Sequence, residues 1–312
     1  MRIGSLFSGY GGLDLAALQL FSGASVAWHC EWDDAPSKIL DHHWPRVPNL
    51  RDVTEVDWAT IEPVDILTGG YPCQPFSAAG QRKGTDDERH LWPYVRDAIR
   101  LLRPRFTLLE NVAGHRSLGF DRVLGDLAED GMHVRWTSLR ASDIGAPHHR
   151  ERIFILVTDP AEQPRRFGNR DDVCTGRGSG LQQSNAGRSG AADTESERLP
   201  GQQQSERVQT EGSSAHGSVG LLPGIDWGDY GPAVRRWERL TRPAPAPTEL
   251  NSNHKPRLNA AFAEWMMGLP VGHVTAVPGI SRAHQLKAIG NGVCPQQAIA
   301  AYSSLLEMEV AA

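Results

Sequence analysis

A cysteine between proline and glutamine lies in the segment Gly69 to Gly80, directly after an apolar run that predicts a strand from Val64 to Thr68. Because ligands of open α/β sheets bind at the carboxyl ends of the strands, Cys73 is predicted at a ligand-binding edge. A buried cysteine is usually an inert small hydrophobe, whereas a Pro-Cys loop between strand and helix exposes a thiol whose thiolate is nucleophilic. The other cysteines lie far apart and form no close pair, so we expect no metal site.

A glycine-rich turn follows the first predicted strand, Arg2 to Phe7, and opens a predicted helix from Leu13 to Phe21. Its glycines allow a cofactor to approach the backbone, and the helix N-terminus favours an anionic group. Glu31, at the end of the second predicted strand, and Asp52 lie about where a ribose-binding carboxylate is expected. Taken singly, the turn also fits a plain strand-to-helix connection, and the acids also fit solvated loop residues.

Short β-rich runs alternate with amphipathic helical patterns from residue 2 to about 158, which is typical of a doubly wound, mostly parallel α/β sheet. The clearest helical periodicity covers Leu91 to Leu102, and a final helix is predicted from about Pro295 to Met308. The predicted strands are Arg2 to Phe7, Ser25 to His29, Val64 to Thr68, Phe106 to Leu109, His133 to Leu139 and Ile153 to Val157.

The composition changes after Thr158. Residues 159–220 are rich in Gly, Ser, Gln and Arg and nearly lack aromatic residues, so they cannot build an apolar core. Ordered patterns return in the basic, helix-like run Ala233 to Leu240 and in an apolar unit from Leu258 to Leu269. We therefore predict a main domain of residues 1–158, completed by 270–312, and a smaller, loop-rich domain of residues 159–269.

The overall composition excludes several classes of protein. With 39% hydrophobic and 22% charged residues the chain is globular, and no stretch approaches the roughly 18 apolar residues of a membrane helix. No secretory leader is evident, so a cytoplasmic location is expected. A net charge of -5 and a pI near 6.2 give no general basic footprint, so any nucleic-acid contact must come from local basic surface.

Several segments together resemble the DNA cytosine-5 methyltransferases of bacteria and phages. The run Pro72 to Ser77 resembles the nucleophile loop of that family, and Glu110 to Val112 resembles its acid motif. Four further segments follow the family order: they are Phe7 to Gly12 (cofactor loop), His148 to Arg152 (basic motif), Pro256 to Asn259 (hinge) and Gln285 with Gly290 to Val293 (C-terminal cofactor motif). The resemblance implies a Rossmann-like S-adenosylmethionine methyltransferase fold with a small target-recognition domain over 159–269.

The resemblance also implies a reaction, methyl transfer to carbon 5 of cytosine in a specific sequence of double-stranded DNA. Carbon 5 is a weak nucleophile, so the Cys73 thiolate would first add to carbon 6 of a base that is flipped out of the helix. Glu110 would hold nitrogen 3 and share a proton with it. Arg150 and Arg152 would bring positive charge to the base carbonyl and a flanking phosphate. The family usually has Gln where this chain has His148.

By the same resemblance, Glu31 would bind the ribose hydroxyls, Trp32 would stack on the adenine, and Asp52 would accept from the adenine amine. The residues implied in binding S-adenosylmethionine are Phe7, Gly9, Gly11, Gly12, Glu31, Trp32, Asp52, Val53, Pro72, Leu91, Asn291 and Val293. The arginines that could reach DNA phosphates or guanine edges, or could form only a solvated face, are Arg165, Arg166, Arg235, Arg236 and Arg239. We expect a monomer.

Two alternatives remain open. One is methylation of RNA on the same fold, because a transfer-RNA branch shares these motifs. That branch has a Cys-Phe-Thr signature, whereas this chain has Cys174-Thr175 without the phenylalanine. The other is a catalytically silent DNA-binding protein, which would be expected to lack Cys73 or Glu110, and both are present.

Overall fold

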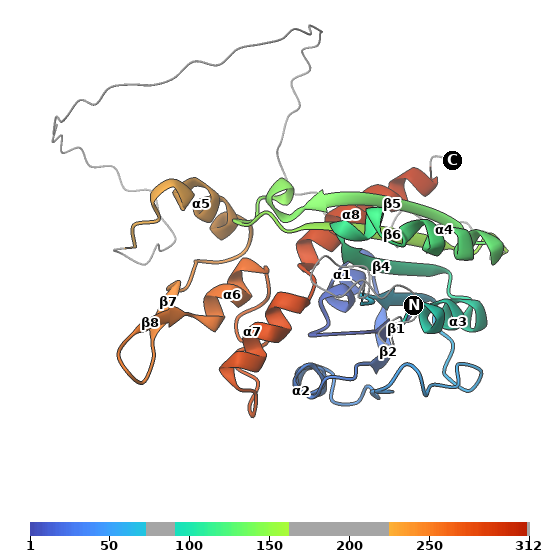
Figure 1. Ribbon diagram of the computed structural model, residues 1–312, viewed down its shortest axis with the longest axis horizontal. Coiled ribbons are helices and arrows are strands. Elements are labelled where there is room, and N and C mark those ends of the chain that lie inside the picture. Colours follow the sequence, from blue (N-terminus) through green and yellow to red (C-terminus); the bar gives the residue numbers. More distant parts are fainter. Residues whose placement is uncertain (73–90, 162–224, 311–312) are drawn as a thin grey trace, which may run out of the picture. The chain divides into compact units, whose positions relative to one another are not determined.

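The computed structural model describes residues 1–72, 91–161 and 225–310, and a six-stranded sheet is its central element (Figure 1). β1 pairs in parallel with β2 and β3, and β3 pairs in parallel with β4, whereas β6 is antiparallel to both of its neighbours. The predicted doubly wound, mostly parallel α/β sheet is therefore confirmed. In spatial order the strands are β2 (Ser25–Cys30), β1 (Arg2–Leu6), β3 (Ile66–Gly69), β4 (Phe106–Val112), β6 (Glu151–Thr158) and β5 (His133–Arg140).

Helices cover both faces of the sheet. α1 (Gly12–Leu20) and α8 (Pro295–Val310) pack on one face, and α3 (Trp92–Leu102) and α4 (Phe120–Glu129) pack on the other. Successive residues of β4 enter opposite apolar clusters, since side chains alternate along a strand. A strand buried on both faces has a continuous apolar sequence, which is why the strands could be recognised from sequence.

The antiparallel strand β6 positions part of the site. It lies between β4 and β5, and its register places Arg152 opposite Val112 at the end of β4. The side chain of Gln297 donates to the carbonyl oxygens of Leu139 and Arg150 at 2.8 and 2.9 Å, which fastens the connection between β5 and β6 to α8. The first residues of β6 therefore lie at the edge of the sheet where β4 ends.

A third apolar cluster joins the remaining elements to the sheet domain. Trp237 of α5 (Gly231–Leu240) and Trp265 of α6 (Ala260–Met266) are fully buried in a cluster that also contains Tyr10 and Ala141. The predicted division into residues 1–158 with 270–312 and residues 159–269 stays a prediction. The other elements are α2 (Asp34–His43), α7 (Arg282–Asn291), the antiparallel pair β7 (Thr248–Leu250) and β8 (Pro256–Leu258), and the short helices η2 (Ala113–Ser117), η3 (Ala141–Ile144) and η4 (Gly228–Tyr230).

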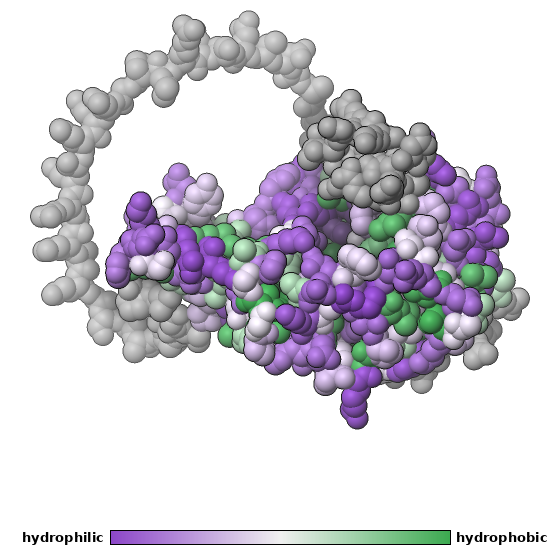
Figure 2. Space-filling model, turned by 60° about the horizontal axis from the view of Figure 1, so that its bottom comes forward, coloured by the Kyte–Doolittle hydropathy of each residue, from purple (hydrophilic) through white to green (hydrophobic). Residues whose placement is uncertain are grey.

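Hydrophilic and hydrophobic residues are mixed on the face drawn in Figure 2. Large apolar side chains that are exposed, among them Trp32, Trp136, Tyr230 and Leu250, come from different elements, and isolated ones are normal on a folded surface. None of the helices in the described ranges is both long and apolar enough to span a bilayer. Trp32 also lines the cavity described below.

Candidate active site

A cavity of about 670 Å³ opens at the carboxyl ends of β1, β2, β3 and β4, the edge where the sequence predicts ligand binding. Its volume lies within the range of about 300–1,000 Å³ that is usual for small-molecule sites. Gly11 and Arg150 do not line it, and Cys73 lies outside the described residues. The predicted residues that do line it are Phe7, Gly9, Gly12, Glu31, Trp32, Asp52, Val53, Pro72, Leu91, Glu110, Arg152, Asn291 and Val293.

The loop after β1 has an unusual backbone. Phe7 and Gly9 have φ angles of +49° and +57°, and the Phe7 amide donates to the carbonyl oxygen of Cys30 at 2.8 Å. A bulky residue at positive φ costs about 1–3 kcal/mol and persists only where its surroundings hold it. Such residues gather at functional sites, which is consistent with a loop shaped to follow a ligand.

The two segments predicted to bind the cofactor, Phe7 to Gly12 and Gly290 to Val293, are in direct contact. A Cβ atom on Gly12 would lie 2.4 Å from the carbonyl oxygen of Val293, and one on Gly292 would lie 1.9 Å from the ring of Tyr10. The Tyr10 hydroxyl donates to the same Val293 oxygen at 2.6 Å. Gly12 and Gly292 therefore allow the two chain segments to pack closely against each other. Neither motif reveals this role when it is taken alone.

Arg150 stabilises this junction by hydrogen bonds to its backbone. Its guanidinium donates to the carbonyl oxygen of Gly290 at 3.1 Å and also to that of Gly292. Gly11 has a related supporting role, because its φ is +82° and a Cβ there would lie 2.7 Å from the ring of Trp44. Two predicted site residues thus shape the cavity wall without facing the cavity.

Glu31 connects the first loop to the end of β2. Its two carboxylate oxygens accept from the backbone amides of Gly9 and Asp33, both at 2.8 Å. Burial raises the pKa of this carboxyl group, and the two amide donors oppose that rise. A carboxylate oxygen has more than one acceptor position, so Glu31 can still accept from a ligand hydroxyl in the cavity.

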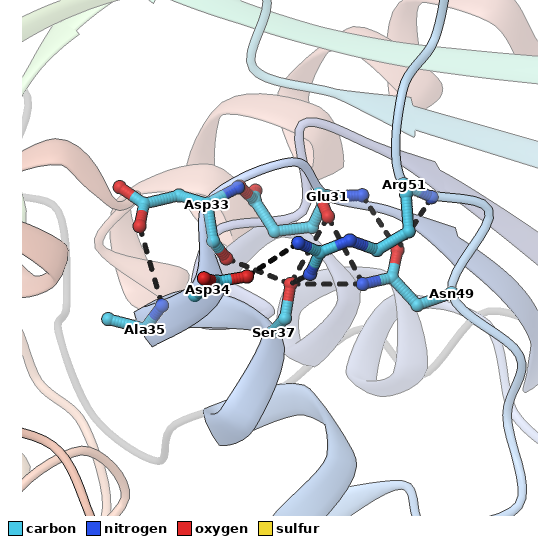
Figure 3. Close-up of polar contacts among 7 residues, drawn as sticks. All are labelled: Glu31, Asp33, Asp34, Ala35, Ser37, Asn49 and Arg51. Carbon is cyan, nitrogen blue, oxygen red and sulfur yellow. Dashed lines mark hydrogen bonds and ion pairs between the residues drawn. The ribbon is translucent and has the colours of Figure 1, made fainter. Parts of the chain in front are cut away.

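Asn49 binds the backbone of Glu31 (Figure 3). Its amide accepts from the Glu31 backbone N–H at 2.9 Å and donates to the Glu31 carbonyl oxygen at 3.1 Å. Arg51 donates to Ser37 and to Asp34, both at 2.6 Å. Asn49, Ser37 and Arg51 could not be predicted as site residues, since nothing in their spacing marks them before the chain folds.

The mouth of the cavity carries an aromatic side chain beside an ion pair. Trp32 is 68% exposed although it lines the cavity, which leaves its ring free to stack on a flat ligand. Lys287 of α7 contacts the Asp33 carboxylate at 2.6 Å, and this hydrogen bond lowers the pKa of Asp33. Neither Lys287 nor Asp33 was among the residues predicted from the sequence.

Asp52, which also lines the cavity, accepts from the backbone and hydroxyl of Thr54 through one oxygen, Oδ1.

The opposite side of the cavity is formed by a buried acid and an arginine. Glu110 is 7% exposed, and its Oε1 lies 3.0 Å from Nε of Arg152. Burial raises the pKa of Glu110, while the charges of Arg152 and Arg150 lower it in part. A carboxyl group with a raised pKa can hold a proton closer to neutral pH and deliver it to a ligand atom.

His148 faces α6. Its Nε2 lies 2.8 Å from the carbonyl oxygen of Met266, so this nitrogen must carry the proton. Burial lowers the pKa of His148, which keeps the ring neutral. The side chain thus fastens the start of β6 to the segment that follows the hinge motif.

The candidate DNA-contacting arginines differ in their surroundings. Arg235, Arg236 and Arg239 are all exposed on α5, and Arg236 alone of the three is also seen to donate to the carbonyl oxygen of Gly145, at 3.3 Å. Arg165 and Arg166 lie outside the described residues. No group of three or more His, Cys, Asp or Glu side chains suited to a metal ion occurs in the described ranges.

Comparison with known proteins gives a consistent result. Residues 1–172 match the family model described as C-5 cytosine-specific DNA methylase. The Type II methyltransferase M.NlaX of Neisseria lactamica is 34% identical over 160 residues, which cover 50% of this chain and 51% of that protein. The chain thus spans about half the length of the curated relatives it matches.

Two solved structures resemble the fold along nearly the whole chain. The S. pombe Dnmt2 methyltransferase superposes with a TM-score of 0.60 and 14% identity, covering 99% of both chains. A DNA modification methyltransferase encoded within an E. coli prophage gives a TM-score of 0.55 and 19% identity, covering 96% of both chains. At these identities the likeness concerns the fold alone.

Proposed function

Because the chain belongs to the family of C-5 cytosine-specific DNA methylases, we propose that it transfers a methyl group from S-adenosylmethionine to carbon 5 of cytosine in double-stranded DNA. The observation that carries the proposal is a single cavity bounded on one side by Glu31 and Trp32 and on the other by Glu110 and Arg152. The names of the curated relatives, Type II methyltransferases, favour DNA of a specific sequence as the substrate.

The cofactor side of the cavity suits S-adenosylmethionine. An exposed Trp32 ring is available for a flat base, and buried Glu31 offers acceptor positions for ribose hydroxyls. Asp52 and Asn291 add polar groups to the cavity lining, and nothing lies within 4 Å of a Cβ built on Gly9, so the loop leaves open space there. When bound, S-adenosylmethionine supplies an electrophilic methyl group.

On the base side we assign the chemistry to Cys73, Glu110 and Arg152. The Cys73 thiolate would add to carbon 6 of the cytosine while Glu110 shares its proton with nitrogen 3, so that negative charge does not build up on the ring. Arg152, 3.0 Å from Glu110, would keep this carboxyl group oriented. After carbon 5 has been methylated, loss of its proton and departure of the sulfur restore the aromatic ring.

The base has to leave the duplex to reach this cavity, at a cost of a few kcal/mol in unstacking and unpairing. Contacts with the phosphate backbone supply affinity that is independent of sequence. The exposed pair Arg235 and Arg239 on α5 is suited to such contacts. Arg150, which holds Gly290 and Gly292, would act by supporting the cofactor motif.

Tritiated S-adenosylmethionine and unmodified duplex DNA test the proposal directly, with nucleosides separated after digestion. We expect label in 5-methylcytosine with the wild-type chain and none with Cys73→Ala. Cys294→Ala is the matched control, because that thiol is buried, its pKa is raised to about 11, and it does not line the cavity. Label in competing transfer RNA instead of DNA would favour the RNA alternative, and no label in either would contradict the proposal.

A further inference from the structure

Tyr71 is a buried aromatic residue that comes two positions before Cys73 in the sequence. Its ring packs against Trp92, with centroids 5.4 Å apart, and edge-on against His115 at 5.6 Å. The next residue, Pro72, lines the cavity together with Glu110. The segment that leads to the proposed nucleophile is therefore anchored on the apolar side of the sheet that is covered by α3 and α4.

His115 binds the Tyr71 hydroxyl in a defined tautomer. Nδ1 of His115 lies 2.9 Å from the carbonyl oxygen of Leu118, and Nε2 lies 2.8 Å from the Tyr71 hydroxyl oxygen. A carbonyl oxygen only accepts, so Nδ1 carries the proton of the neutral ring and Nε2 accepts from the tyrosine. Burial lowers the pKa of His115, which favours this neutral form.

The backbone of Tyr71 is held as well. Nδ2 of Asn111 donates to the Tyr71 carbonyl oxygen at 3.0 Å, and Oδ1 of Asn111 accepts from the Val112 amide at 2.8 Å. Asn111 directly follows Glu110, so the end of β4 that presents the acid also holds the peptide before Pro72. The proline ring fixes φ, and it also restricts the residue before it, so little freedom remains in this connection.

We propose that His115 is a positioning residue: through the Tyr71 hydroxyl, and together with Asn111, it fixes the course of the chain up to Pro72, the residue that precedes the proposed nucleophile Cys73. This inference rests on the proposed function. His115 and Tyr71 would not touch the reacting atoms and would act only through the course of the backbone. The competing explanation is structural, in which His115 serves only to close η2 through its contact with Leu118.

Two substitutions at the same position separate these explanations. In His115→Gln the amide oxygen reaches about as far as Nε2 and can accept from Tyr71, while the contact with Leu118 is lost. In His115→Asn the amide nitrogen replaces Nδ1 and can donate to Leu118, while the contact with Tyr71 is lost. A positioning role predicts a functional Gln variant and an impaired Asn variant, and a purely structural role predicts the reverse.

The readout is the rate at which a denaturant-resistant adduct forms with duplex DNA that contains 5-fluorocytosine, at saturating S-adenosylmethionine. Fluorine replaces the hydrogen that must leave carbon 5, so the sulfur bond persists. We expect Tyr71→Phe and His115→Asn to slow adduct formation by about 10- to 100-fold, because small misplacements of a reacting group have effects of this size. His115→Gln should remain within about 2-fold of the wild-type rate.

Two additional results test whether Tyr71 and His115 act together. The double variant Tyr71→Phe with His115→Asn should form the adduct no more slowly than the slower single variant, because both substitutions break the same hydrogen bond. The dissociation constant for S-adenosylmethionine should stay unchanged in all of them. If His115→Asn traps DNA at the wild-type rate while His115→Gln does not, the positioning role is overturned. If the wild-type chain forms no adduct, the proposed function itself fails and this inference falls with it.

Discussion

The two sides of the cavity are built by different means. The cofactor side depends on close approach of backbone segments: Gly12 faces Val293, Gly292 faces the Tyr10 ring, and Phe7 has a left-handed conformation. The base side depends on charge, since buried Glu110 is paired with Arg152 at 3.0 Å. One side should therefore be sensitive to an added methyl group, and the other should be sensitive to a changed charge or proton.

This contrast fits the two ligands of the proposed function. A cofactor that is bound and released in each cycle needs a surface of fixed shape, which tightly packed glycines provide without moving side chains. A base that changes its charge during the reaction needs a group that can give up and regain a proton. Substitutions on each side of the cavity test this comparison, and they follow in order from the largest expected effect to the smallest.

Glu110→Gln removes the transferable proton and keeps the shape of the side chain. We expect methyl transfer to fall by about 10²- to 10⁴-fold, the usual contribution of a positioned acid or base. The dissociation constant for S-adenosylmethionine should change by less than about 2-fold, because Glu110 lies on the base side. Single-turnover kinetics and equilibrium dialysis would measure the two quantities, and equal losses in both would contradict the division of the cavity.

Gly292→Ala tests the cofactor side. Its Cβ would meet the Tyr10 ring at 1.9 Å, and overpacking of this kind costs about 1–3 kcal/mol or more. We expect the affinity for S-adenosylmethionine to fall by about 10-fold or more, together with a lower midpoint of thermal unfolding. In the matched control Gly125→Ala the new Cβ meets nothing within 4 Å in α4, so stability should rise slightly, by up to about 1 kcal/mol. Wild-type affinity in Gly292→Ala would argue against the glycine contact.

Trp32→Ala tests the exposed ring at the mouth of the cavity. Stacking of a base on an aromatic side chain is worth about 1–3 kcal/mol by alanine substitution, so we expect roughly 5- to 150-fold weaker cofactor binding. The cofactor affinity of Trp32→Phe should lie between those of the wild type and Trp32→Ala. The stability of both variants should hardly change, because the ring is 68% exposed. A cofactor affinity that is independent of residue 32 would place the adenine elsewhere.

The smallest effect concerns stability as a function of pH. Burial raises the pKa of Glu110 in the folded chain above its unfolded value, so the folded state binds more protons and loses stability as pH rises through that interval. Glu110→Gln has no such titration. We expect the midpoint of thermal unfolding of the wild type, relative to this variant, to fall as pH rises from about 4.5 and then to level off above the folded pKa. A wild-type midpoint that rises relative to the variant over this range would mean that the Arg152 charge outweighs burial.

The six strands of the central sheet and the helices α1, α3, α5 and α8 could be predicted because they carry strong local patterns, whereas α2, α4, α7 and the pair β7 and β8 were not predicted. The strand predicted over Phe106 to Leu109 is β4, which continues to Val112, and the helix predicted over Leu13 to Phe21 is α1, which begins and ends one residue earlier. Most residues implied in cofactor binding line the cavity for the same reason, since their motifs follow strands. Contacts between distant segments could not be predicted: the Tyr71–His115 hydrogen bond joins residues 44 positions apart, and Lys287 meets Asp33 over 254 positions.

Bisulfite sequencing of DNA from cells that express the chain tests the central claim most directly. Cytosines within one recurring short sequence should resist conversion when the wild-type chain is expressed, and all should convert when Cys73→Ala is expressed at the same level. Complete conversion in the wild-type sample, or equal protection by Cys73→Ala, would contradict methylation of carbon 5 through this cysteine.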